Sequence, residues 1–249
     1  MLTRLLPPSF TLPDIASQCA VCRSWPARPV CQPCVARFVS VAPRCRRCAL
    51  TLPADLSLGL RSHPGLCLSC ITHAPPLDAA LAAVAYAFPW SDLIAHYKFG
   101  GKSGWSSFFA GLLLQTPGVP AALAAMGADD WILPMPLSAQ RLQSRGFNQA
   151  WALAQALARQ AGCRARPDAR LLLRVKDTRP QSQLKREARL ANVKGAFMVE
   201  PLRAAALAGR RVVLVDDVMT SGASLSTAAQ ALRDAGAAHI TAVVLARTE

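Results

Sequence analysis

Residues 212–224 bring acidic and small polar side chains together at a spacing that could bind a phosphorylated ligand. Two carboxylates, Asp216 and Asp217, follow four consecutive aliphatic residues, and a group of small residues comes shortly after them. The small residues are Thr220, Ser221, Gly222, Ala223 and Ser224. Small side chains at the start of a helix leave backbone N–H groups accessible, and the positive end of the helix dipole attracts a phosphate there. The segment therefore predicts a phosphate site beside two carboxylates.

The carboxylates indicate what else this ligand must carry. Two negative charges beside a bound phosphate repel it, unless the ligand also offers vicinal hydroxyl groups or a divalent cation. 5-Phosphoribosyl 1-pyrophosphate (PRPP) offers both, because its ribose has vicinal hydroxyls and its pyrophosphate binds Mg²⁺. We therefore interpret Asp216 and Asp217 as the catalytic pair, which orients the ribose and stabilises positive charge at C1. Residues 220–224 would hold the 5′-phosphate, and Mg²⁺ would bind with PRPP.

Two arginines follow another strand-like segment. Arg141 and Arg145 come after the apolar run 131–135. The carboxyl ends of parallel strands meet at one edge of a sheet, so these arginines are expected near the carboxylates, where they could bind pyrophosphate oxygens in pairs. The alternative is that both side chains form the solvated face of a helix.

Eight of the nine cysteines form four Cys-x-x-Cys pairs. Two sulfurs three positions apart can bind one metal ion, and two such pairs complete a tetrahedral site. Four thiolates leave no position open for a substrate, so we predict two structural Zn²⁺ sites. The ligands are Cys19, Cys22, Cys31, Cys34, Cys45, Cys48, Cys67 and Cys70.

Alternatives for these cysteines stay open at the level of sequence. The simplest pairing is consecutive, with the first two pairs at one site and the last two at the other, and an interleaved order is the alternative. The cysteines could also be reduced and buried, or joined as disulfides. The amino-terminal segment has prolines at positions 7, 8 and 13 and no continuous apolar stretch, so it is a poor secretory signal. We therefore expect a cytoplasmic protein, where metal binding is favoured over disulfides.

The pattern of the chain changes near Pro75 and Pro76. Before this point the chain is rich in cysteine, proline and arginine; after it, apolar runs of strand length alternate with helical stretches. That alternation predicts an α/β fold with a parallel sheet. We place a double zinc-ribbon domain at 1–75 and the α/β domain at 76–249. The expected strands are 82–88, 131–135, 170–175, 195–200, 211–216 and 239–246, and the expected helices are 90–99, 105–115, 147–161, 183–191 and 222–235.

Positive charge is concentrated in one part of the chain. The 249 residues include 28 basic and 14 acidic ones, and residues 141–194 hold thirteen of the basic and three of the acidic ones. A basic segment of this kind can bind the phosphates of single-stranded DNA. The candidates are Arg179, Lys185, Arg186 and Arg189. Alternatively, these charges only keep the protein soluble. The longest apolar runs fall short of the ~20 residues that span a membrane, so no membrane insertion is expected.

The order of the motifs resembles a known family. The cysteine pairs come first, followed by Pro-Met-Pro-Leu (134–137), Arg-Gly-Phe-Asn-Gln (145–149), the polar stretch 178–192 and the segment 213–224. This order is similar to that of the competence protein F family (ComF/ComFC type), and 212–224 resembles the PRPP-binding signature of type I phosphoribosyltransferases. The lysine-containing stretch 93–100 is also similar. Met219 and Ser221 replace the Leu and Thr that relatives often carry, and they preserve size and polarity.

The resemblance implies a double zinc ribbon joined to a type I phosphoribosyltransferase-like, PRPP-binding domain. It also implies a role in DNA uptake, natural transformation or the use of imported DNA. Three functions follow: a PRPP-binding protein that also binds single-stranded DNA; an active phosphoribosyltransferase with an unidentified acceptor; and a zinc-ribbon adaptor that docks onto a helicase or another DNA-uptake protein. The sequence leaves open whether the domain is an enzyme.

Overall fold

The computed structural model describes residues 17–39, 42–53, 63–99, 104–176 and 195–249. The chain divides into two compact units, 1–38 and 39–249, which are described separately below. Composition changes near residue 75, whereas the compact units divide after Phe38. The domain limits 1–75 and 76–249 stay a prediction.

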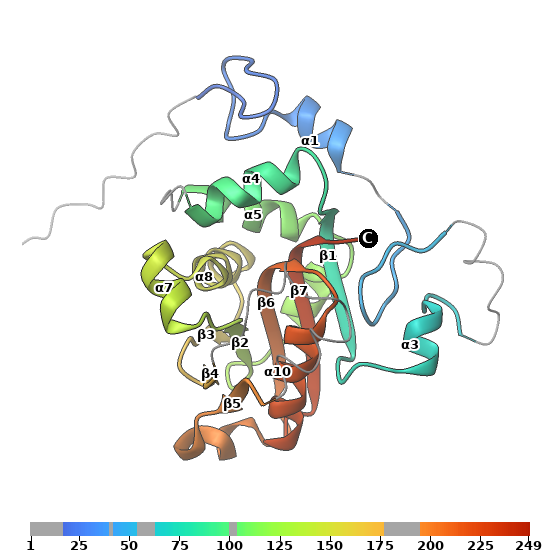
Figure 1. Ribbon diagram of the computed structural model, residues 1–249, viewed down its shortest axis with the longest axis vertical. Helices are drawn as coiled ribbons and strands as arrows, with labels where there is room; N and C mark the ends of the chain where they lie inside the picture. Colours follow the sequence, from blue (N-terminus) through green and yellow to red (C-terminus); the bar gives the residue numbers. More distant parts are fainter. Residues whose placement is uncertain (1–16, 40–41, 54–62, 100–103, 177–194) are drawn as a thin grey trace, which may run out of the picture. The chain divides into compact units, whose positions relative to one another are not determined.

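A five-stranded parallel sheet forms the centre of the larger unit (Figure 1). Leu133 of one strand lies opposite Leu214 of the next, and Leu214 lies opposite Ala242 of a third. The two central strands are buried along most of their length, because a parallel sheet is covered on both faces. In spatial order the strands are β1 (Ala79–Ala85), β7 (His239–Arg247), β6 (Arg211–Met219), β2 (Trp131–Pro134) and β3 (Arg166–Pro167).

Helices cover both faces of this sheet. Leu214 of β6 is buried with Ala228 and Leu232 of α10 (Ala223–Asp234). Val213, which points to the opposite face because side chains alternate along a strand, is also buried. Further helices contact the sheet or each other, and they are α4 (Trp90–Phe99), α5 (Gly104–Leu114), α6 (Val119–Ala124) and α8 (Gln149–Ala161). The α/β fold class with a parallel sheet flanked by helices is therefore confirmed.

Two of the expected strands belong elsewhere. β4 (Leu172–Arg174) and β5 (Phe197–Val199) pair antiparallel with each other, outside the main sheet. Both runs were expected to be strands, and both are, but a short apolar run does not predict which strand it pairs with. The structure adds α7 (Ala139–Arg145) and a 3₁₀-helix at Pro201–Leu207. The expected helix 183–191 lies outside the described residues.

The cysteine-containing segments are short and irregular. In the smaller unit, a bridge between Ser17 and Ala27 precedes α1 (Gln32–Phe38). In the larger unit, Cys45 and Cys48 lie in a hairpin at 44–51, Cys67 is the N-cap residue of α3 (Leu68–Thr72), and Cys70 lies within this helix. None of the helices in the described ranges has the length and apolar character needed to cross a membrane.

Candidate functional site

A cavity of about 460 Å³ lies at the carboxyl ends of β6 and β2. Open parallel sheets bind their ligands at this edge. Eight of the nine residues that we predicted for a phosphoribosyl ligand line the cavity, and Ser221 belongs to the same loop. The eight are Arg141, Arg145, Asp216, Asp217, Thr220, Gly222, Ala223 and Ser224. The fold therefore brings together predicted site residues that lie up to some 80 positions apart in the sequence.

The carboxylate pair stands near the end of β6 in a poorly hydrated environment. Asp217 is buried, and its backbone N–H donates to Oδ1 of Asp216 at 2.9 Å. Burial and the negative charge of Asp217 raise the pKa of Asp216 to about 8. Two carboxylates so close together are strained electrostatically, and a cation or hydroxyl groups of a ligand would relieve that strain.

Lys98 faces this pair, although it was not among our predicted site residues. Its Nζ atom lies 3.3 Å from Oδ2 of Asp217 and forms an ion pair with this carboxylate. The neighbouring Tyr97 fixes α4 in place, because its buried hydroxyl contacts the Ser106 hydroxyl at 2.9 Å and donates to the Gln149 carbonyl at 2.8 Å. Two adjacent carboxylates that line one cavity are a donor set that fits Mg²⁺.

The two arginines lie on the short helix α7. The Ser138 side chain caps its first turn by accepting from the Arg141 N–H, and Gly146 ends the helix with a φ of 76°. Asn148 then links two elements: its side chain caps α8 and donates to the Met135 carbonyl at 3.1 Å. Burial, together with the positive charge of Arg141, lowers the pKa of Arg145. The cavity therefore carries two adjacent cations opposite the carboxylates.

Residues 220–224, which we call the phosphate loop, join β6 to α10. Gly222 has a φ of 78°, and a Cβ atom there would lie 2.6 Å from Cε of Met219. Only glycine fits this backbone without strain. Gly222 also occupies the N-cap position of the twelve-residue helix α10, so the first N–H groups of the helix lie beside the cavity. This geometry suits a phosphate.

Several residues that line the cavity were missed as site residues. They are Lys98, Tyr86, Gln149 and Arg174. Lys98 had a signal, since it lies in the stretch 93–100 that resembles the family. Arg174, at the end of β4, had none, because the position of an antiparallel pair beside the site cannot be read from local sequence. The DNA-binding candidates Arg179, Lys185, Arg186 and Arg189 lie outside the described residues.

The cysteines form two clusters, one in each unit, and the pairing is consecutive. Within each cluster the four Sγ atoms lie within 4.8 Å of one another. The Sγ atoms of Cys22 and Cys31, and those of Cys48 and Cys67, are 3.6 Å apart, close to the spacing of about 3.8 Å across a tetrahedral zinc–thiolate site. The first cysteine cluster is Cys19, Cys22, Cys31 and Cys34, and the second cysteine cluster is Cys45, Cys48, Cys67 and Cys70.

Backbone N–H groups favour thiolates in both clusters. Cys31 donates to Sγ of Cys19 at 3.3 Å, and Cys67 donates to Sγ of Cys45 at 3.3 Å. A hydrogen bond from the Cys48 side chain lowers the pKa of Cys45 to about 4, against the effect of burial, and the Cys67 N–H adds to it. Each cluster could therefore hold one metal ion.

The fold and the site define the class of the protein. Residues 148–249 match the family model described as a phosphoribosyl transferase domain. This match covers the phosphate loop, the carboxylate pair and the strands β6 and β7. The larger unit therefore contains a phosphoribosyl transferase domain.

The chain is similar to named proteins from several bacteria, and one of these similarities extends over nearly the whole chain. It is 33% identical over 247 residues to DNA utilization protein YhgH of Salmonella typhimurium, which covers 96% of this chain and 99% of the relative. It is 32% identical over 182 residues to competence protein F of Haemophilus influenzae, covering 73% and 78%. It is also 31% identical over 118 residues to competence protein ComFC of Bacillus subtilis, covering 47% and 44%. The chain belongs to the competence protein F family.

Proposed function

We propose that this protein binds PRPP together with Mg²⁺ and acts in DNA uptake or in the use of DNA that has been taken up. One observation carries the proposal of PRPP: a single cavity joins the carboxylate pair, the phosphate loop and two arginines. The names of the relatives, DNA utilization protein and competence protein, support the role with DNA. The cytosol is the expected compartment for this role.

Each group in the cavity has a distinct task in this proposal. The phosphate loop binds the 5′-phosphate through backbone N–H groups, and Arg141 and Arg145 bind the pyrophosphate. Asp216 and Asp217 accept hydrogen bonds from the ribose hydroxyls and stabilise positive charge at C1. Bound Mg²⁺ supplies charge that offsets the pyrophosphate oxygens, and the same two carboxylates are the residues that would hold it.

Calorimetry with PRPP and Mg²⁺ tests the ligand. The native protein should release or absorb heat on binding, and Asp216→Asn with Asp217→Asn should reduce the affinity at least ~30-fold, because two charged interactions are lost. Asp129→Asn is the matched control, since Asp129 is exposed and pairs with Arg210 away from the cavity. A native protein that gives no heat, or a double variant that binds like the control, would refute PRPP binding.

Transfer of the phosphoribosyl group is the enzymatic extension of this proposal. In this extension Asp216 and Asp217 face C1 of the bound ribose, and Lys98 of α4 lies beside the pair. Release of pyrophosphate from PRPP, measured across a panel of bases, amines and DNA ends, tests for catalysis. Failure with every acceptor would leave a binding protein, whereas release with one class would identify the acceptor.

Single-stranded DNA is the proposed partner outside the cavity. The chain has a formal charge of +14, and the candidates Arg179, Lys185, Arg186 and Arg189 belong to its most basic segment. Replacing these four residues by Gln should reduce the slope of log affinity against log salt concentration by about 3, because single-stranded DNA releases about 0.7 counterion per contact. An unchanged slope would show that these residues do not contact phosphates. Docking onto a helicase stays a separate hypothesis.

Both cysteine clusters are proposed to hold structural Zn²⁺. Four thiolates at tetrahedral spacing favour zinc over harder metals. Metal analysis of purified protein should give about two zinc ions per chain. One ion, or none, would show that a cluster has another role.

A further inference from the structure

Arg247 occupies an unusual place at the carboxyl end of β7. It pairs with Ala85 of β1 on one side and with Met219 of β6 on the other, next to the phosphate loop. It is one of the few charged residues buried among the described part of the chain, at 7% exposure. Sequence analysis gave it no role.

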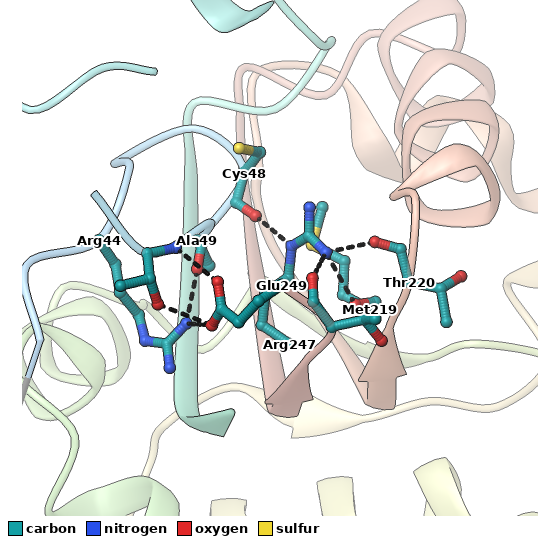
Figure 2. A network of polar contacts seen from close by, with 9 residues as sticks. Arg44, Cys48, Ala49, Met219, Thr220, Arg247 and Glu249 are labelled. Carbon is teal, nitrogen blue, oxygen red and sulfur yellow. Dashed lines mark hydrogen bonds and ion pairs between the residues drawn. The ribbon is translucent and has the colours of Figure 1, made fainter. Parts of the chain in front are cut away.

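The guanidinium of Arg247 joins two parts of the larger unit (Figure 2). Its Nε atom donates to the Cys48 carbonyl at 2.9 Å. Its Nη1 atom contacts the carbonyls of Met219, at 3.3 Å, and of Thr220 and Thr248. A guanidinium is planar and its donors have fixed directions, so the acceptors are held in a fixed relation to one another. The second cysteine cluster and the start of the phosphate loop therefore share one rigid side chain.

The hairpin 44–51 is fastened to the same strand end by a second residue. The carboxylate of Glu249 accepts from Arg44 at 2.9 Å, from the Thr51 N–H at 3.0 Å and from the Thr51 hydroxyl at 2.6 Å. Arg44 also donates to the Ala49 carbonyl within the hairpin. Cys48 consequently cannot shift without disturbing residues 247–249.

A metal ion bound at the second cysteine cluster would fix the turn that contains Cys48. Its Sγ atom lies 3.6 Å from Sγ of Cys67, which comes from a different segment. Metal sites of this kind couple binding to local folding, so loss of the metal would release the turn and its carbonyl. A buried guanidinium that loses an acceptor is costly, and Arg247 would rearrange together with the Thr220 carbonyl.

We propose that Arg247 is a positioning residue that couples metal binding at the second cysteine cluster to the conformation of the phosphate loop. The coupling to PRPP rests on the proposed function, whereas the coupling to the loop conformation does not. Because coupling between two sites is reciprocal, PRPP should also raise the affinity of this cluster for its metal ion.

Hydrogen exchange of the metal-loaded full chain tests the link without any ligand. Arg247→Met should retain both metal ions, while the amides of residues 221–225 exchange about tenfold faster, because charged hydrogen bonds to the loop are lost. Arg233→Met is the matched control. It also removes a partly buried arginine that contacts Asp78 and the carbonyls of Ala237 and Ala238, but at the opposite end of α10. Equal exchange in both variants would overturn the proposal.

A double-variant comparison tests whether metal and arginine act on the same element. We expect Cys67→Ser with Cys70→Ser, and Arg247→Met, each to weaken PRPP binding about tenfold, and the combination to weaken it no further. Effects that multiply would refute the coupling. If the cysteine variant fails to fold, the zinc affinity of the native protein, measured by competition with a chelator, decides instead. Saturating PRPP should raise the affinity of one zinc site in the native chain but not in Arg247→Met, and an equal increase in both would refute the coupling.

Failure of the two proposals can be told apart. If the native protein binds no PRPP, the proposed function fails, and the ligand-free exchange at residues 221–225 still decides the role of Arg247. If PRPP binds and Arg247→Met changes neither exchange nor affinity, only the positioning role fails.

Discussion

Each of the two cysteine clusters consists of four cysteines in two Cys-x-x-Cys pairs, but their structural surroundings differ. The first lies in the smaller unit, where Cys22 is exposed and contacts Ser24. The second lies in the larger unit, where Cys45 is fully buried and the Cys48 carbonyl accepts from Arg247. A Cys-x-x-Cys pair therefore predicts a metal site but not its setting. The contacts around the second cluster make it part of the larger unit, which also contains the candidate site.

The largest expected effect is a difference between the two clusters in how much their loss destabilises the larger unit. Cys45→Ser with Cys48→Ser should lower the free energy of unfolding of the larger unit by about 4 kcal/mol, because loss of a structural metal is among the most damaging changes. Cys19→Ser with Cys22→Ser should leave it within about 0.5 kcal/mol. Urea unfolding followed by the fluorescence of the buried Trp90 and Trp105 measures this difference. Similar losses in both variants would contradict it.

A smaller effect is expected when the phosphate loop is changed and both clusters are left intact. Gly222→Ala should weaken PRPP binding about tenfold in calorimetry while two metal ions remain bound, because alanine is strained at this φ and its Cβ meets Met219. Gly162→Ala is the control. It has a φ of 57° but no atom within 4 Å of its Cβ position, so it shares the strain without touching the loop. Equal loss of affinity in both variants would point to a general loss of stability.

The smallest effect concerns the carboxylate that fastens the hairpin. Although burial opposes it, hydrogen bonds from Thr51 and the charge of Arg44 lower the pKa of Glu249. An acid whose pKa is lower in the folded than in the unfolded state stabilises the fold at pH values above its unfolded pKa. This stabilisation is lost as the pH falls through its folded pKa. The Glu249 side chain is 40% exposed and solvent screens its contacts, so Glu249→Gln should cost only about 0.5 kcal/mol at pH 7 and progressively less below about pH 4.5. Urea unfolding at several pH values measures the difference in free energy of unfolding between the native chain and the variant. A difference that stays constant with pH would show that the charge of the Glu249 carboxylate does not stabilise the fold.

Local patterns predicted much of the candidate site. Aliphatic residues, two aspartates and small residues follow one another within 212–224, so one strand, one turn and one helix start could be read directly. The parallel sheet was predictable for a similar reason, since its central strands are continuous apolar runs. Lys98 was recognisable only through the resemblance of its surrounding stretch, because a lysine near the end of an amphipathic helix usually faces solvent.

Contacts between distant parts of the chain could not be predicted. Cys48 and Arg247 are separated by 199 positions. The contact uses the backbone carbonyl of Cys48, which every residue type has, so the sequence gives no sign of it. The same limit applies to β4 and β5, whose apolar runs look like those of the parallel strands although they pair with each other. The order in which cysteine pairs combine was also left open, because spacing along the chain does not fix spacing in the fold.

The contact between Cys48 and Arg247 also has a consequence for synthesis of the chain. A ribosome releases the second cysteine cluster long before residues 247–249, which hold its hairpin in place. The cluster can therefore bind metal early, but it reaches its final setting only when the last strand has emerged and paired. Chains that stop before β7 would keep all eight cysteine ligands and lack this anchor, which would expose the cluster to metal loss and to proteases.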